Sequence, residues 1–150
     1  MSGIYRQQES GRSMIEIIGV LAIMGIMTVA AFVLIRNGMA TQKRNVVIDD
    51  VAKIVTGVRA LYADYDDLSN LDSDYALAAM GVDENGPYED STYSVAAVTG
   101  DYPQQFVVTV SGLPARDCIV LASRKWAEVV TNGKSSDCTD TYSVSLTYDK

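Results

Sequence analysis

The sequence contains no histidine, only two cysteines and only three prolines, and no proline precedes Pro87. Without histidine, the Ser-His-Asp and Cys-His catalytic arrangements are excluded, as are zinc sites that use histidine. Two cysteines cannot supply a four-thiolate metal site within one chain. Because no catalytic constellation remains, we expect a protein that is not an enzyme and that carries neither a metal nor another cofactor.

Positive charge is also scarce, with 12 Lys and Arg against 19 Asp and Glu and a formal net charge of −7. This balance argues against nucleic-acid binding through an overall basic surface. The acidity is concentrated in residues 64–90, which contain no Lys or Arg. Their segment DYDDLSNLDSD lacks the ligand spacing of a calcium loop. A solvated connecting loop is favoured, and a calcium site is the alternative.

Residues 14–35, MIEIIGVLAIMGIMTVAAFVLI, form an apolar run whose single ionisable side chain is Glu16. As an α-helix this run is about 33 Å long, which is enough to cross the hydrocarbon core of a bilayer. It is too long for the hydrophobic region of a secretory signal peptide, which spans about 7–15 residues. Near the helix start, a carboxylate costs less than at the bilayer centre and the helix dipole favours it. A plain membrane anchor with a tolerated first-turn acid is therefore one interpretation.

A second interpretation comes from Gly11, which lies five residues before Glu16 and follows a short polar segment. The run Gly11-Arg12-Ser13-Met14-Ile15-Glu16 and the apolar helix after it closely resemble the class III signal of type IV pilins and pseudopilins. The resemblance implies that a prepilin peptidase cuts after Gly11, methylates the new amino terminus at Arg12 and leaves Glu16 as the fifth mature residue. The chain departs from the usual pattern because Arg12 replaces an apolar or aromatic first residue.

We accordingly expect residues 1–11 to be a leader, 12–36 a transmembrane and filament-core helix, and 37–150 a globular domain outside the cytoplasm. The first part of that domain, residues 37–65, predicts an amphipathic helix that continues the apolar one. Its apolar positions follow i, i+3, i+4 spacing: Val47, Val51, Ile54, Val55, Val58, Leu61, Tyr62 and Tyr65.

The second half of the chain predicts an antiparallel sheet and hence an α+β fold. Apolar and polar residues alternate around three centres, Val95, Val108 and Leu146. Between the second and third strands, Pro114 and Gly133 indicate the limits of a helical segment. The residues expected on its buried face are Ile119, Ala122, Trp126 and Val129.

The cysteines, Cys118 and Cys138, could form a bridge that contributes about 3 kcal/mol. A disulfide is favoured because the anchor would deliver the domain to an oxidising compartment, and two buried thiols are the alternative.

Taken together, the long helix, acidic loop, sheet and cysteine pair resemble a whole type IV pilin. The region around Leu113-Pro114 and Cys118 resembles the type IVb branch. The resemblance implies a subunit that waits in the inner membrane with its domain in the periplasm. The pilus assembly machinery then polymerises it with other copies of itself into a surface filament, where Glu16 faces the amine of a neighbour's Arg12. A pseudopilin of a type II secretion-like system and a membrane-anchored periplasmic binding module are the alternatives.

Overall fold

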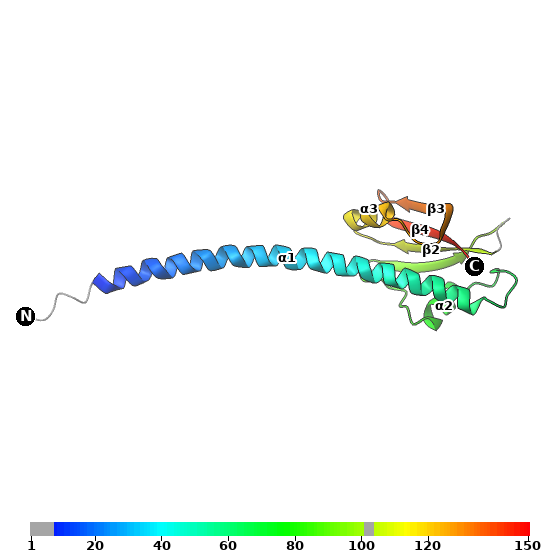
Figure 1. Ribbon diagram of the computed structural model, residues 1–150, viewed down its shortest axis with the longest axis horizontal. Coiled ribbons are helices and arrows are strands. Elements are labelled where there is room, and N and C mark those ends of the chain that lie inside the picture. Colours follow the sequence, from blue (N-terminus) through cyan, green and yellow to red (C-terminus); the bar gives the residue numbers. More distant parts are fainter. Residues whose placement is uncertain (1–7, 101–103) are drawn as a thin grey trace, which may run out of the picture. The chain divides into compact units, whose positions relative to one another are not determined.

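The computed structural model describes the backbone of residues 8–100 and 104–150, with side chains from residue 14 onward. The chain divides into unit 1, Met1–Ala40, and unit 2, Thr41–Lys150, which are treated separately below. The predicted α+β class is confirmed, because a long apolar amino-terminal helix is followed by a small antiparallel sheet (Figure 1). This combination is consistent with a pilin-like fold.

The long helix is α1, Gln8–Leu61, and it runs without interruption. No proline interrupts this stretch, so every backbone amide within it can join the helical hydrogen-bond ladder. The helix starts earlier than the predicted residue 12, so its backbone includes residues 8–11 of the expected leader. It also ends before Tyr65. The prediction that the apolar stripe reaches Tyr65 was wrong, since this side chain is 55% exposed beyond the helix end.

The part of α1 in unit 2 buries the predicted stripe against the sheet. Its apolar side chains join one hydrophobic cluster with inward-facing residues of the strands, including Phe106, Val108 and Leu146. The buried members on α1 and just after its end are Val47, Val51, Ile54, Val55, Val58 and Tyr62. One face of α1 packed on one face of the sheet therefore forms the centre of the core, and residues of the connecting segments, including Leu68, Leu77 and Leu121, also join it.

The sheet has four antiparallel strands, one more than the sequence analysis expected. The strands are β1 Thr92–Ala97, β2 Gln105–Ser111, β3 Val129–Asp137 and β4 Ser143–Asp149, in the order β1-β2-β4-β3. The three predicted strands correspond to β1, β2 and β4. In β2 and β4 alternate residues are buried, which is the period-2 pattern of a half-buried strand.

The prediction of a helical segment that extends from Pro114 to Gly133 was wrong. Helix α3 covers only Ala115–Ser123, and β3 takes the positions after it, including Val129. The helix ends because Arg124 adopts an extended conformation. Ile119, expected on the buried face, is 59% exposed, while Cys118 and Leu121 are buried. Strand β3 was not predicted. Its buried and exposed positions do not alternate, and its register with β4 shifts between Val129 and Lys134, so its sequence lacks the period-2 pattern of a regular strand.

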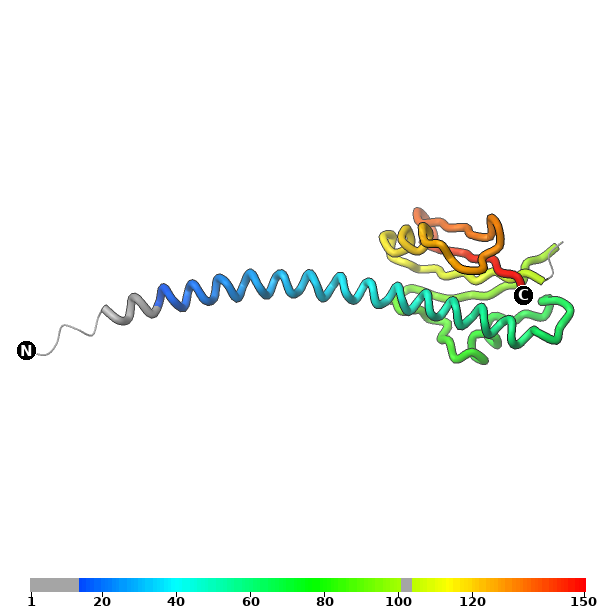
Figure 2. Tube along the Cα trace, in the orientation of Figure 1, coloured from blue at the N-terminus to red at the C-terminus, as the bar shows by residue number. Residues whose placement is uncertain are grey.

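Between α1 and β1 the backbone turns back through the short helix α2, Ser73–Ala79 (Figure 2). The side chain of Asp72 caps it by accepting hydrogen bonds from the amides of Asp74 and Tyr75. Gly81, at φ +65°, lies just past its end, where a residue without a side chain is favoured. Gly112 is required for a different reason: a Cβ there would lie 1.8 Å from the carbonyl oxygen of Asp90.

Candidate functional site

The first candidate site is the apolar segment of α1 in unit 1. Its large apolar side chains from Met14 to Ile35 are all at least half exposed, from 52% at Val20 to 75% at Ile15. A helix that is apolar on every face is suited to a membrane or to the core of a helix assembly, not to water. By length and composition, α1 could cross a membrane.

The polar groups and small residues of this segment suit such an environment. Thr28 satisfies its hydroxyl within the helix, since Oγ1 donates to the carbonyl oxygen of Met24 at 2.7 Å. Gly19 and Gly25 face open space, since a Cβ at either position would have no atom of another part of the chain within 4 Å. Small residues on a helix surface let a second helix backbone approach closely. The segment is therefore equipped both to lie in lipid and to pack against other helices.

The ionisable group of this segment is the exposed Glu16, near its amino-terminal end. The backbone of Gly11 and Arg12 belongs to α1, but the structure describes side chains only from residue 14 onward. A carboxylate in an otherwise apolar surface is costly to desolvate unless a positive group meets it. The predicted processing positions Gly11 and Arg12 and the assembly residue Glu16 thus occupy one continuous stretch of helix.

In unit 2, Cys118 and Cys138 form a disulfide with a Cα–Cα distance of 5.7 Å. The predicted bridge is confirmed, and the alternative of two buried thiols was wrong. The bond joins α3 to the segment that follows β3. It therefore ties the connection between β3 and β4 to α3.

The residue before the second cysteine fixes the same loop by hydrogen bonds. The carboxylate oxygen Oδ1 of Asp137 accepts from the backbone amides of Thr139 and Asp140 and from the Thr139 hydroxyl, at 2.9–3.2 Å. These bonds hold the pKa of Asp137 well below its usual range. This turn was not predicted, although an aspartate followed by threonines is a recognisable signal for it.

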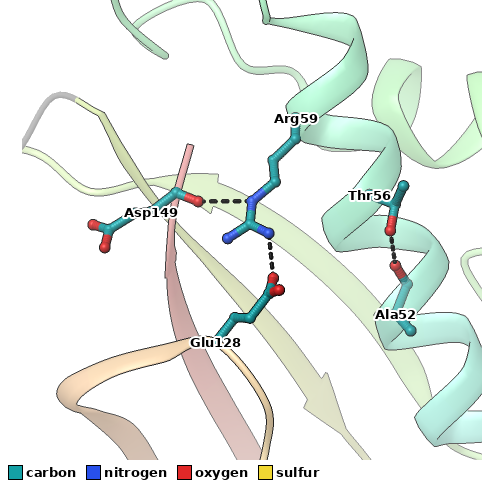
Figure 3. A network of polar contacts seen from close by, with 5 residues as sticks. All are labelled: Ala52, Thr56, Arg59, Glu128 and Asp149. Atoms are coloured by element: carbon teal, nitrogen blue, oxygen red, sulfur yellow. Dashed lines mark hydrogen bonds and ion pairs between the residues drawn. The ribbon is translucent and has the colours of Figure 1, made fainter.

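A polar network around Arg59 attaches α1 to the carboxyl-terminal part of the sheet (Figure 3). Its Nε donates to the carbonyl oxygen of Asp149 at 3.0 Å, and its guanidinium pairs with the carboxylate of Glu128. Burial raises the pKa of Tyr148 to about 12, with the charges of Arg59 and Glu128 acting in opposite directions. None of these contacts could be read from the sequence, since their partners are far apart along the chain.

The acidic segment 64–90 uses several of its carboxylates in local turns. Besides capping α2 through Asp72, it binds Ser69 through Asp67 and Asn85 through Asp83. Across residues 14–100 and 104–150, no group of three or more His, Cys, Asp or Glu side chains is placed to hold a metal ion. The calcium alternative therefore has no geometric support in the part of the chain that the structure describes.

Comparison of the chain with known protein families, with curated proteins and with solved structures found no match.

Proposed function

We propose that this chain is a structural subunit of a type IV pilus, most similar to the type IVb branch. One observation carries the proposal: an apolar helical segment, exposed on every face, bears one carboxylate at Glu16 and a glycine five residues before it. An ordinary anchor needs the apolar length but neither the glycine nor the carboxylate. A processed, polymerising helix uses all three.

Before assembly, the subunit would lie in the inner membrane with unit 2 in the periplasm. The apolar length of α1 supports the anchor, and the Cys118–Cys138 disulfide supports an oxidising compartment for unit 2. A prepilin peptidase at the cytoplasmic face would cut after Gly11 and methylate the amine of Arg12.

Polymerisation would transfer residues 14–35 from lipid into a bundle made of the same segment from other subunits. Both environments are apolar, so the transfer costs little hydrophobic free energy, and helix packing provides the gain. In the bundle, the Glu16 carboxylate needs a positive partner because an unpaired buried charge is expensive. The amine of a neighbouring Arg12 would supply that charge and would fix the axial register of each new subunit.

Electron microscopy of filaments sheared from cells that express the protein, combined with their intact mass, tests this function. We expect filaments whose subunit mass corresponds to residues 12–150 with one methyl group and one disulfide. Cells expressing the Gly11→Val chain are the control and should shed none. A processed chain that stays in the membrane fraction and forms no surface filament would instead favour a pseudopilin or an anchored binding module.

A further inference from the structure

Helix α3 of unit 2 presents a face to which the proposed function assigns no role. The helix buries Cys118 and Leu121 in the core and turns Ile119 and Val120 outward, with exposed fractions of 59% and 39%. Three exposed basic residues flank these side chains. Together the five residues form what we call the α3 face: Arg116, Ile119, Val120, Arg124 and Lys125. A cationic, partly apolar surface stands out on a protein with a net charge of −7.

The neighbouring acids do not neutralise this face, because each is engaged elsewhere. Asp117, the one acid within α3, is buried, and its Oδ1 lies 3.2 Å from Nε of Arg44. Glu128, the next acid after Lys125 in the sequence, pairs with Arg59. Arg124 lies over the ring of Trp126, with Cζ 6.0 Å from the centroid, and among the described residues no carboxylate pairs with Arg116, Arg124 or Lys125. Their positive charges are therefore available to an external partner.

The α3 face is joined by side-chain contacts to the first residues of unit 2. The Arg44–Asp117 ion pair joins α3 to the start of unit 2, and Val120 and Arg124 line a hollow together with Thr41 of α1. Only residues 36–40 separate Thr41 from the end of the apolar run at Ile35. A connection of five residues keeps unit 2 close to any bilayer that the apolar run spans.

We propose that the α3 face docks on a layer of anionic phospholipid headgroups while the subunit waits in the membrane. Exposed aliphatic side chains flanked by lysine and arginine are the combination that binds an anionic bilayer surface. Each basic side chain near such a surface strengthens the attraction about fivefold. Trp126 follows the basic pair, but it packs against the core and its Nε1 donates to the carbonyl oxygen of Leu121 at 3.0 Å, so it is a nearby reporter and not part of the α3 face. The inference rests on the membrane-anchored state of the proposed function and does not require filament formation.

Trp126 makes the inference testable, because it is the sole tryptophan of the chain. The full-length protein would be reconstituted into phosphatidylcholine vesicles and into vesicles containing phosphatidylglycerol, both with a trace of lipid carrying a nitroxide on its headgroup. We expect quenching of Trp126 to be at least about twofold stronger in the anionic vesicles. The excess should vanish at about 1 M salt, where the Debye length falls to about 3 Å.

Two variants assign the effect to the α3 face. Lys125→Glu should lose most of the excess quenching, and Ile119→Ser should reduce it by removing the apolar contact. Lys53→Glu is the matched control, since it makes the same charge change at an exposed lysine on α1 and should keep the excess.

Equal quenching of the wild-type protein in both kinds of vesicle would overturn the proposal. So would an excess that Lys125→Glu and Lys53→Glu reduce equally, because the attraction would then depend on overall charge alone. Filament yield is scored separately for each variant by electron microscopy. A wild-type chain that shows lipid-dependent quenching but forms no filaments would count against the pilus function and leave the docking inference intact.

Discussion

Nε of Arg44 lies 3.2 Å from Oδ1 of Asp117, so an ion pair joins α1 to α3 within unit 2. The two side chains are 21% and 9% exposed, which leaves little water to screen their attraction. The carboxylate also acts on Tyr88, whose pKa is raised first by burial and then by Asp117. The ion pair connects two segments that are distant in sequence, and the charge of Asp117 acts on a third at Tyr88 without a hydrogen bond to the Tyr88 hydroxyl.

Asp117→Asn should therefore lower the free energy of unfolding of unit 2 by about 1–3 kcal/mol, because Arg44 would lose its counter-charge in a poorly solvated position. Denaturant unfolding followed by Trp126 fluorescence measures the change. Lys53→Gln is the control, since it removes an exposed i,i+3 pair that should contribute less than about 0.5 kcal/mol. Equal losses of unfolding free energy in the two variants would show that the Arg44–Asp117 pair stabilises unit 2 no more than the exposed pair does.

Gly11→Val should leave the protein unprocessed, because a side chain at the residue before the scissile bond replaces the glycine of the signal. Amino-terminal sequencing and intact mass of wild-type filaments should show a chain that begins at Arg12 and carries an N-methyl group. Ser2→Val, in the leader but away from the cleavage position, is a control that should be processed normally. Mature filaments that begin at Met1 would contradict the prediction.

Glu16→Ala should insert in the membrane and be cleaved but assemble poorly. Removing a charge from an apolar helix makes its transfer into lipid easier, and Gly11 remains intact for cleavage. Assembly should suffer because the amine of a docking subunit loses its counter-charge in an apolar core. The measurement is the amount of pelleted filament per cell beside abundance in the membrane fraction. Wild-type filament yield would falsify a role for Glu16 beyond that of a tolerated first-turn acid.

Cys118→Ser should lower the free energy of unfolding of unit 2 by about 2–5 kcal/mol, as is typical when a native disulfide is removed from a small exported domain. Chemical unfolding with and without reductant measures this difference. The wild-type protein should lose stability in reductant, whereas the variant should be indifferent to it. A reductant effect of the same size in both proteins would mean that the Cys118–Cys138 bond is not its source.

Unit 2 should lose stability as the pH rises above about 10, the ordinary pKa of tyrosine. Burial raises the pKa of Tyr148 to about 12 and also raises the pKa values of Tyr88 and Tyr93. Between pH 10 and 12 the folded state therefore binds more protons than the unfolded state, so the free energy of unfolding falls as pH rises.

Tyr148→Phe should reduce that loss, by about 1–2 kcal/mol at pH 11.5, while keeping the ring that stacks on Phe106 with centroids 5.8 Å apart. Urea unfolding between pH 8 and 11.5 measures the slope. An unchanged slope in Tyr148→Phe would assign the alkaline loss to other groups.

Local periodicity predicted much of unit 2. The helical spacing from Val47 to Tyr62 and the alternation around Val108 and Leu146 each reflect one face packed on a core, which a short window of sequence records. The region between Pro114 and Gly133 failed because β3 is an irregular edge strand whose positions do not alternate in burial. Ile119 was wrongly predicted to be buried, because helical spacing alone does not tell whether an apolar residue lies on the buried or the exposed face of a helix.

The sequence by itself determined the length and uniform apolarity of residues 14–35, the position of Glu16 among them, and the spacing from Gly11. These are local features, fixed by residue type and helical rise. The pair of cysteines also allowed the disulfide to be predicted, but only the tertiary structure decided that Arg44 meets Asp117 and which side of α3 faces outward. Each of these depends on how the sheet brings distant segments together, and such long-range contacts leave no periodic trace in the chain.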